Sequence, residues 1–316
     1  MDIYNQSFGL KKNPFNMTPD PESLFLTNQH REALAGLNYA ILQRKGFVVL
    51  TGDAGTGKTT LLARILRFLP TTRVQSSVIL NPTLTPEEFL ELTLLDFGVH
   101  DVPSSKAQRL RKLQHLLVDG GSKGRISVLI IDESHKLSRD VLEEIRLLGN
   151  FEEPDGKLLQ IILVGQDELD DLLNREDLRQ LKQRISVRLS IAPLSRSDVE
   201  PYMHHRWQIA GGDNLPFSED AISLIAELSG GIPRVINNLC DNSFALAVSE
   251  GLTSIAPRHV RDAAFDLRLS VSPSSLNGNE SKLFNGSREL MTDDDLVGRP
   301  SSFESEWTIR LPREKS

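Results

Sequence analysis

The sequence has almost no cysteine and no long hydrophobic run. Cys240 is the single cysteine among 316 residues, which excludes an internal disulfide and any metal site built from several cysteines. No apolar run approaches the ~20 residues that a membrane-spanning helix needs. Residues 1–9 lack the basic start and apolar stretch of a signal peptide. We therefore expect a cytoplasmic protein without a membrane span of its own.

Neither sign of charge dominates the composition. The chain has 36 basic and 43 acidic residues, a formal net charge of -7 at pH 7, and is 39% hydrophobic, as folded globular proteins are. The acidic balance argues against nucleic-acid binding over the whole surface but leaves a local basic patch open. The length favours one large domain with a smaller one.

Three zones follow one another along the chain. Residues 1–192 alternate short apolar runs with helical spacing, and we interpret them as an α/β core. Residues 193–269 carry apolar residues at helical spacing and predict a smaller helical lid domain. Residues 270–316 are rich in Ser, Gly, Pro and Asn, and we expect this tail to be disordered because it buries too little apolar surface.

The apolar runs of the first zone lack polar alternation, as strands buried on both faces do. They lie at 47–51, 78–80, 128–131 and 160–164, and helical spacing separates them. One of the intervening helices opens at Thr85, where Thr85, Pro86 and Glu88 form a capping-box signal. Strands separated by helices indicate a parallel sheet. In the second zone, helices are expected at 197–210, 218–228, 235–249 and 257–267.

A glycine-rich segment follows the first predicted strand and opens a helix. It matches the G-x-x-x-x-G-K-[ST] pattern of a phosphate loop in full. The residues expected to bind nucleotide are Gly52, Asp53, Ala54, Gly55, Thr56, Gly57, Lys58, Thr59 and Thr60. Glycines let successive backbone N–H groups face the phosphates, and the helix N-terminus favours the same anion. The Lys58 ammonium is expected on the β- and γ-phosphates and the Thr59 hydroxyl on Mg²⁺.

Two acids end the predicted strand at 128–131. Asp132 is expected to hold Mg²⁺ together with Thr59, and Glu133 to polarise the attacking water as a general base. On its own the pair would favour a solvated strand end. Its position after a buried strand downstream of a phosphate loop favours the catalytic interpretation, because ligands bind at the carboxyl ends of parallel strands.

Several further segments carry a family resemblance. They are Phe8-Gly-Leu-Lys-Lys-Asn-Pro-Phe15, Thr18-Pro-Asp-Pro21, His30-Arg-Glu-Ala-Leu34, the run from Leu158 to Gln166, and Gly230-Gly-Ile-Pro-Arg-Val-Ile-Asn237. Together with the two sites above, they resemble the ATPase domain of the ExeA-type general secretion pathway protein A family within the AAA+ ATPases. The resemblance covers roughly residues 1–268 and implies a P-loop AAA+ core with a helical lid.

The resemblance also implies roles for residues outside the two motifs. Gln166 corresponds to a polar sensor of the γ-phosphate, and Arg234 to an arginine that bridges the lid to the phosphates. Arg184 corresponds to an arginine finger that reaches a neighbouring subunit, with Arg188 as the alternative. For each of these residues a solvated polar side chain is the competing interpretation, on a helix for the two finger candidates.

The adenine ring is expected against the N-terminal aromatic and apolar residues. These residues are Tyr4, Phe8, Pro14 and Phe15, for which packing in the core is an equal alternative. The family resemblance implies ATP, with Mg²⁺, as the ligand, and ATP hydrolysis to ADP and phosphate is the expected reaction.

Three functions remain open at this stage. The leading one is an ATP-driven assembly switch, a homo-oligomer with an envelope or secretion-machinery protein as partner. Secretion-type members of the family carry a membrane span and a periplasmic region that this chain does not show, which weakens that role. The alternatives are a DNA-binding ATPase resembling transposon target-selection proteins, with DNA-dependent turnover, and a nucleotide-gated scaffold with little turnover.

Overall fold

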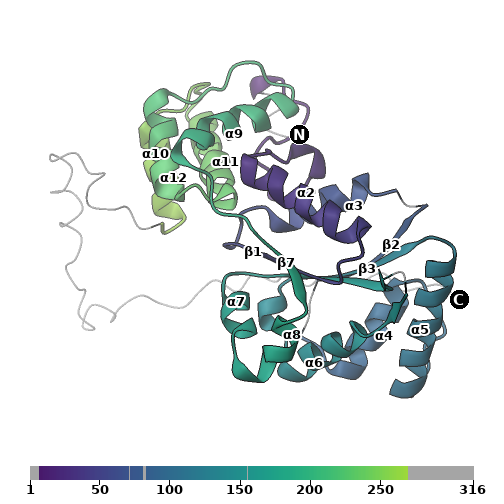
Figure 1. The fold of residues 1–316 in the computed structure, drawn as a ribbon. Helices are drawn as coiled ribbons and strands as arrows, with labels where there is room; N and C mark the ends of the chain where they lie inside the picture. Colours follow the sequence, from purple (N-terminus) through teal and green to yellow (C-terminus); the bar gives the residue numbers. More distant parts are fainter. Residues whose placement is uncertain (1–6, 71, 81–82, 155, 270–316) are drawn as a thin grey trace, which may run out of the picture. The chain divides into compact units, whose positions relative to one another are not determined.

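A parallel sheet forms the centre of the first part of the chain. The computed structural model describes residues 7–70, 72–80, 83–154 and 156–269 (Figure 1). Within these ranges, five parallel strands pair in the order β2-β3-β6-β1-β7. The strands are β1 (Phe47–Thr51), β2 (Val74–Ile79), β3 (Ile126–Ile131), β6 (Leu159–Val164) and β7 (Ile185–Ser190). The expected α/β fold class with a parallel sheet is confirmed.

Both faces of the sheet are covered by helices, and alternate strand residues point to each side. On β1, Val48 and Leu50 join the cluster with α2 (Asn28–Leu42) and α3 (Lys58–Phe68). Phe47 and Val49 join the opposite cluster. Figure 1 shows α2 and α3 on one side of the sheet and α4 to α8 on the other. The helices of that second side are α4 (Pro86–Asp96), α5 (Lys106–Ser122), α6 (Arg139–Leu148), α7 (Glu168–Leu173) and α8 (Arg179–Lys182).

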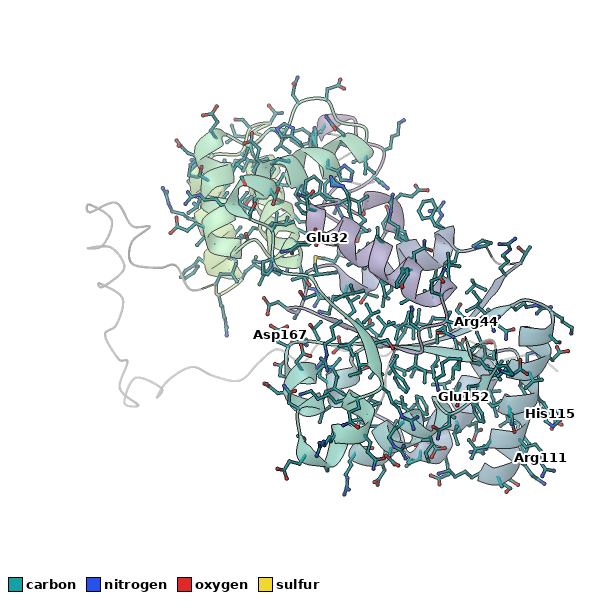
Figure 2. The ribbon with its side chains drawn as sticks, in the orientation of Figure 1. Glu32, Arg44, Arg111, His115, Glu152 and Asp167 are labelled. Carbon is teal, nitrogen blue, oxygen red and sulfur yellow. The ribbon has the colours of Figure 1, made fainter. Side chains whose placement is uncertain are left out.

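Local sequence signals explain where α4 begins and which side of α5 is buried. The capping box at α4 is present: Glu88 N–H donates to Thr85 Oγ1 at 3.3 Å, and Thr85 N–H donates to Glu88 Oε2 at 2.8 Å. On α5, Leu113 is buried one turn from Leu117, as the 3.6-residue period requires. Arg111 and His115 lie on the exposed side of the same helix (Figure 2).

Four further helices form a separate hydrophobic cluster after the sheet. They are α9 (Arg196–Ile209), α10 (Glu219–Ser229), α11 (Pro233–Ser249) and α12 (Pro257–Asp266). The N-terminal residues Leu10 and Phe15 are fully buried in this cluster, although we had assigned residues 1–192 to the core. Aromatic packing holds this segment: Phe15 meets Phe217 edge-on at 6.1 Å, and Phe8 meets Phe244 edge-on at 4.7 Å.

The structure corrects one part of the sequence interpretation. Arg188 had been weighed as a solvated helix charge, but it lies on β7, a strand that we did not predict. The second strand begins at Val74, four residues before the expected start. Short elements complete the fold: η1 (Pro21–Ser23), η2 (Ser134–Lys136), η3 (Glu176–Leu178), β4 (Glu152–Glu153) and β5 (Gly156–Lys157).

The predicted tail at 270–316 lies outside the described residues. Among the residues that are described, no helix is both long enough and apolar enough to span a bilayer.

Candidate functional site

The phosphate loop joins the end of β1 to the start of α3. Gly52 and Gly55 have φ angles of 149° and 84°, which residues with a side chain rarely adopt. A Cβ on Gly52 would lie 2.2 Å from the Ile191 carbonyl oxygen, and one on Gly55 would lie 2.7 Å from Arg234 Cβ. Backbone curvature and close packing therefore both require glycine here.

The Lys58 ammonium lies inside this loop. It donates to the carbonyl oxygens of Gly52 at 2.7 Å and Asp53 at 2.8 Å, and the residue is only 7% exposed. Burial lowers the pKa of Lys58, and the nearby carboxylates of Asp132 and Glu133 oppose that shift. A buried cation in a glycine-rich loop at a helix N-terminus is suited to an anion that brings several negative charges.

Thr59 and Asp132 meet at the carboxyl ends of β1 and β3. The Thr59 hydroxyl donates to Asp132 Oδ2 at 2.8 Å, and Asp132 is 5% exposed. A hydroxyl oxygen beside a carboxylate is the kind of oxygen pair that Mg²⁺ accepts. No cluster of three or more His, Cys, Asp or Glu side chains suited to a metal occurs among the described residues. The remaining ligands of a magnesium ion here would have to be phosphate and water oxygens.

Glu133 occupies a strained backbone position directly after Asp132. Its φ of 54° is left-handed, which costs a residue with a side chain roughly 1–2 kcal/mol. The strain is held by neighbours: Glu133 N–H donates to Asp132 Oδ1 at 2.8 Å, and Lys136 N–H donates to the Glu133 carbonyl at 2.9 Å. Such strain concentrates at functional sites and aims the side chain away from the path of the strand.

Two partners of the Glu133 carboxylate were missed by the sequence analysis. Lys136 Nζ lies 2.8 Å from Glu133 Oε2, and His135 Nε2 lies 3.7 Å from the same oxygen. The hydrogen bond from Lys136 lowers the pKa of Glu133. The signal was the run Glu133-Ser-His-Lys136, because a 3-10 turn brings residues three apart together.

Gln166 reaches the same place from β6. Its backbone N–H donates to His135 Nδ1 at 3.3 Å, and its side-chain Nε2 lies 3.4 Å from His135 Nε2. Because Nδ1 accepts, the ring proton is on Nε2, and the Gln166 amide pairs better with its oxygen toward that proton. The His135 imidazole thus connects Gln166 with Glu133. Asp167, at the start of α7 (Figure 2), adds to the negative charge around Lys58.

Arg234 comes to the loop from the helical part of the chain. Pro233 occupies the first turn of α11, where a missing N–H costs nothing. The Arg234 N–H donates to the Gly55 carbonyl at 3.2 Å, so the start of α11 touches the phosphate loop.

One cavity of about 530 Å³ brings most of the expected site residues together. Its lining includes Lys58, Thr59, Glu133, Gln166 and Arg234, together with Ala54, Gly55, Thr56, Gly57, Thr60 and Lys136. Asp132 does not line the cavity, but it accepts a hydrogen bond from the Thr59 hydroxyl, and Thr59 does line it.

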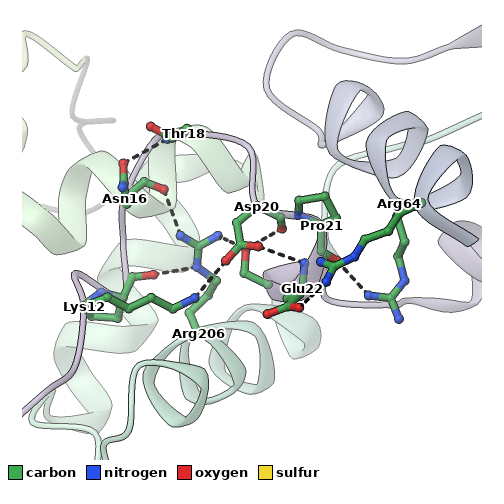
Figure 3. Close-up of polar contacts among 11 residues, drawn as sticks. Lys12, Asn16, Thr18, Asp20, Pro21, Glu22, Arg64 and Arg206 are labelled. Atoms are coloured by element: carbon green, nitrogen blue, oxygen red, sulfur yellow. Dashed lines mark hydrogen bonds and ion pairs between the residues drawn. The ribbon is translucent and has the colours of Figure 1, made fainter.

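The expected adenine wall needs correction. Phe8 and Phe15 do not line the cavity, because both rings pack with Phe244 inside the helical cluster. Pro14 does not line it either, and Tyr4 lies outside the described residues. The cavity wall is made instead by the next part of the segment, Asn16 to Asp20, with Leu24 and Phe25. Figure 3 shows Asn16, Thr18 and Asp20 around Arg206.

The two candidates for a finger lie away from this cavity lining. Arg184 directly precedes β7, and its Nη1 donates to the Arg146 carbonyl at 2.8 Å. Ile185 pairs with Phe47, the first residue of β1. Arg184 therefore lies at the amino ends of the strands, whereas the phosphate loop lies at their carboxyl ends. From there its side chain does not line its own cavity. Arg188 pairs with Asp170 on α7, whose other oxygen accepts from the Thr51 hydroxyl at 3.3 Å.

Comparison with known proteins agrees with this arrangement. A family model described as an AAA domain matches residues 41–173. General secretion pathway protein A of Aeromonas hydrophila is 40% identical over 270 residues, which are 84% of this chain and 48% of that protein. The chain belongs to the AAA+ family. The resemblance drawn from the motifs is thus confirmed, and this AAA+ chain spans about half the length of that relative.

The AAA+ chain is also similar in sequence to a protein named for DNA, and in fold to a structure solved with nucleotide. The ATP-dependent target DNA activator B of Escherichia phage Mu is 27% identical over 270 residues, which are 83% of this chain and 78% of that protein. The ORC2 protein of Aeropyrum pernix, solved as ADPNP-ADP complexes, has a TM-score of 0.64 at 19% identity, with 84% of this chain and 75% of that one covered. The last comparison concerns the fold alone.

Proposed function

We propose that this AAA+ chain is a Mg²⁺-dependent ATPase that works as an ATP-driven assembly switch. The observation that carries the proposal is the convergence of Lys58, Thr59, Glu133, Gln166 and Arg234 on one cavity of about 530 Å³. That volume is in the usual range for a ligand pocket of roughly 300–1,000 Å³. The loop N–H groups and Lys58 suit a triphosphate, and Thr59 with Asp132 suits the magnesium ion that accompanies it.

Each side chain has a definite task in the proposed reaction. Thr59 and Asp132 would hold the magnesium ion, whose charge would offset that of the phosphates. Lys58 and Arg234 hold the phosphates, and Gln166 senses the terminal one. Glu133 accepts a proton from the water that attacks the γ-phosphorus, so that ADP and phosphate leave. Glu133 must first part from Lys136, because a carboxylate paired with an ammonium is a weaker base.

The switch follows from the contact between the loop and the helical cluster. Arg234 N–H bonds the Gly55 carbonyl and its side chain lines the cavity, so phosphates at the loop bear on the start of α11. We further propose that Arg184 acts in trans in a homo-oligomer, since it lies opposite its own site. An envelope or secretion-machinery protein is the proposed partner, by analogy with the Aeromonas hydrophila relative. The cytoplasmic location stays a prediction.

The similarity to the phage Mu protein favours a second candidate, a DNA-dependent ATPase. The alignment covers 78% of that DNA activator, against 48% of the secretion protein. DNA binding would predict turnover that needs duplex DNA and falls steeply with salt.

Steady-state ATP hydrolysis separates the candidates. The purified chain is assayed across protein concentrations, with and without duplex DNA, beside Glu133→Gln as the inactive control. A turnover per chain that rises with protein concentration and does not change with DNA supports the assembly switch. A turnover that needs DNA supports the second candidate. No hydrolysis above the control under either condition, with ATP still bound, would instead favour a nucleotide-gated scaffold.

A further inference from the structure

Arg206 on α9 binds the N-terminal segment at three points. Its Nε donates to the Pro14 carbonyl at 2.6 Å, its Nη1 to Ser23 Oγ at 3.0 Å, and its Nη2 to the Asn16 carbonyl at 2.9 Å (Figure 3). The outermost acceptors, Pro14 and Ser23, are nine residues apart, and Ser23 ends the short helix η1. A guanidinium supplies a planar fork of donors, so one side chain fixes the path of that stretch in a way a single ammonium does not.

The segment that Arg206 holds forms one part of the cavity wall. The phosphate loop, Glu133 and Gln166 line the part suited to the phosphates. Apart from Lys136, the rest of the lining comes from residues 16–20, from Ser23 to Phe25, from His30 and Leu194, and from Tyr202, Arg206, Pro233, Arg234 and Asn237 on α9 and α11. A nucleotide whose phosphates lie on the loop has only this remaining part for its ribose and base.

The wall has little regular structure of its own to hold it. Between residue 7 and η1, it is held by its own buried side chains Leu10 and Phe15 and by polar contacts. Arg64 on α3 donates to the Pro21 carbonyl at 2.8 Å, and Lys12 pairs with Asp20 at 2.9 Å. Arg206 is the anchor on the α9 side, and two of its acceptors are backbone carbonyls that would lose a charged partner on its removal.

We propose that Arg206 is a positioning residue for the nucleoside part of the site. It holds residues 14–23, which carry the wall at residues 16–20, in the shape that receives ribose and base, and acts on the nucleotide through that wall. The inference rests on the proposed nucleotide-binding function and adds to it the residue that prepares the base end of the pocket. A preformed wall raises affinity because less ordering remains to be done on binding.

The test compares a nucleotide with a ligand that has only its phosphates. Isothermal titration with ATP and with inorganic tripolyphosphate, both with Mg²⁺, is done on the wild type, Arg206→Ala and Arg206→Lys. Arg206→Ala is expected to lower the affinity for ATP at least about tenfold and the affinity for tripolyphosphate less than about twofold, because only ATP contacts the wall. Arg206→Lys should lie between, since it keeps the charge and loses the fork.

Arg67→Ala is the matched control. It removes an arginine that pairs with Glu22 of the same segment at 2.8 Å, but both side chains are more than half exposed and neither lines the cavity. Its affinity for ATP should equal that of the wild type, because exposed pairs contribute little.

Two results would overturn the inference. Unchanged ATP affinity in Arg206→Ala removes the wall from nucleotide binding, and an equal loss for ATP and tripolyphosphate means that Arg206 acts on the phosphates or on folding in general. Should Arg206→Ala fail to fold in a thermal melt, the Arg206→Lys titration decides on the same comparison. If the wild type binds no ATP, the proposed function itself is overturned. If the wild type binds ATP and the substitution has no effect, only the role of Arg206 is overturned.

Discussion

Lys58→Met tests whether the phosphates lie on the loop. In the structure Lys58 is 7% exposed, and its ammonium donates to the carbonyl oxygens of Gly52 and Asp53. Methionine keeps an unbranched stem of similar length and removes the charge. The fold should therefore tolerate the change, because the removed group leaves two carbonyls that water can reach through the cavity.

The expected loss of affinity follows from the charge and its distance. A unit charge about 4 Å from a phosphate charge, at an effective dielectric constant of about 20, contributes about 4 kcal/mol, or nearly a thousandfold in affinity. Part of this is offset, because Lys58 must weaken its bonds to the two carbonyls when phosphates arrive. We therefore expect ATP to bind about a hundredfold to a thousandfold more weakly.

Binding is measured by isothermal titration, and by the rise in melting temperature that ATP produces. Lys136→Met is the matched control, since it removes the same charge from the lining of the same cavity. Lys136 is 54% exposed and pairs with Glu133, so it should matter far less for ATP affinity. Equal losses in both variants would mean that only net charge counts, and an unchanged affinity in Lys58→Met would refute the placement of the site.

Three further predictions concern the base, the finger and acid pH. Glu133→Gln should bind ATP normally and stop hydrolysis, and normal turnover would remove Glu133 from its role. Arg184→Ala should lose hydrolysis and regain it when mixed with Glu133→Gln, a mixed-assembly assay in which no recovery contradicts a finger in trans. Burial lowers the pKa of His30, so below its usual pKa the unfolded chain binds more protons and stability falls with falling pH. The melting temperature should therefore drop from pH 7.5 to 5.5, and less so in His30→Gln.

The sequence predicted the central strands because both of their faces are buried. Residues of β3 and β6 are all buried and apolar apart from Ser127 and Gln160, so their runs stand out. β7 has no such run. It is an edge strand in which half-buried residues alternate with exposed ones, among them Ser186 and Arg188. A polar alternation over six residues beside a short helix does not distinguish a strand from the end of that helix.

The candidate site was predictable where a local motif carries the geometry. The loop glycines, Lys58 and Thr59 are held by one continuous turn, so their spacing is enough. Phe8 and Phe15 were left open between an adenine wall and the core because an aromatic side chain suits both equally, and the tertiary fold places them in the core. His135 was missed because its role depends on Gln166, which lies 31 residues away, after the end of β6.

The site holds its own side chains in pairs that a nucleotide must replace. Lys58 donates to loop carbonyls, the Thr59 hydroxyl donates to Asp132, and Glu133 accepts from Lys136. Each pair satisfies a buried or charged group that would otherwise be costly to leave alone. In the proposed function, phosphates and magnesium would compete with the first two pairs, so the affinity would be a difference between two sets of contacts. The third pair also lines the cavity, and it must open before Glu133 can accept a proton. In the proposed reaction, a partner that draws Lys136 away from Glu133 would therefore raise turnover.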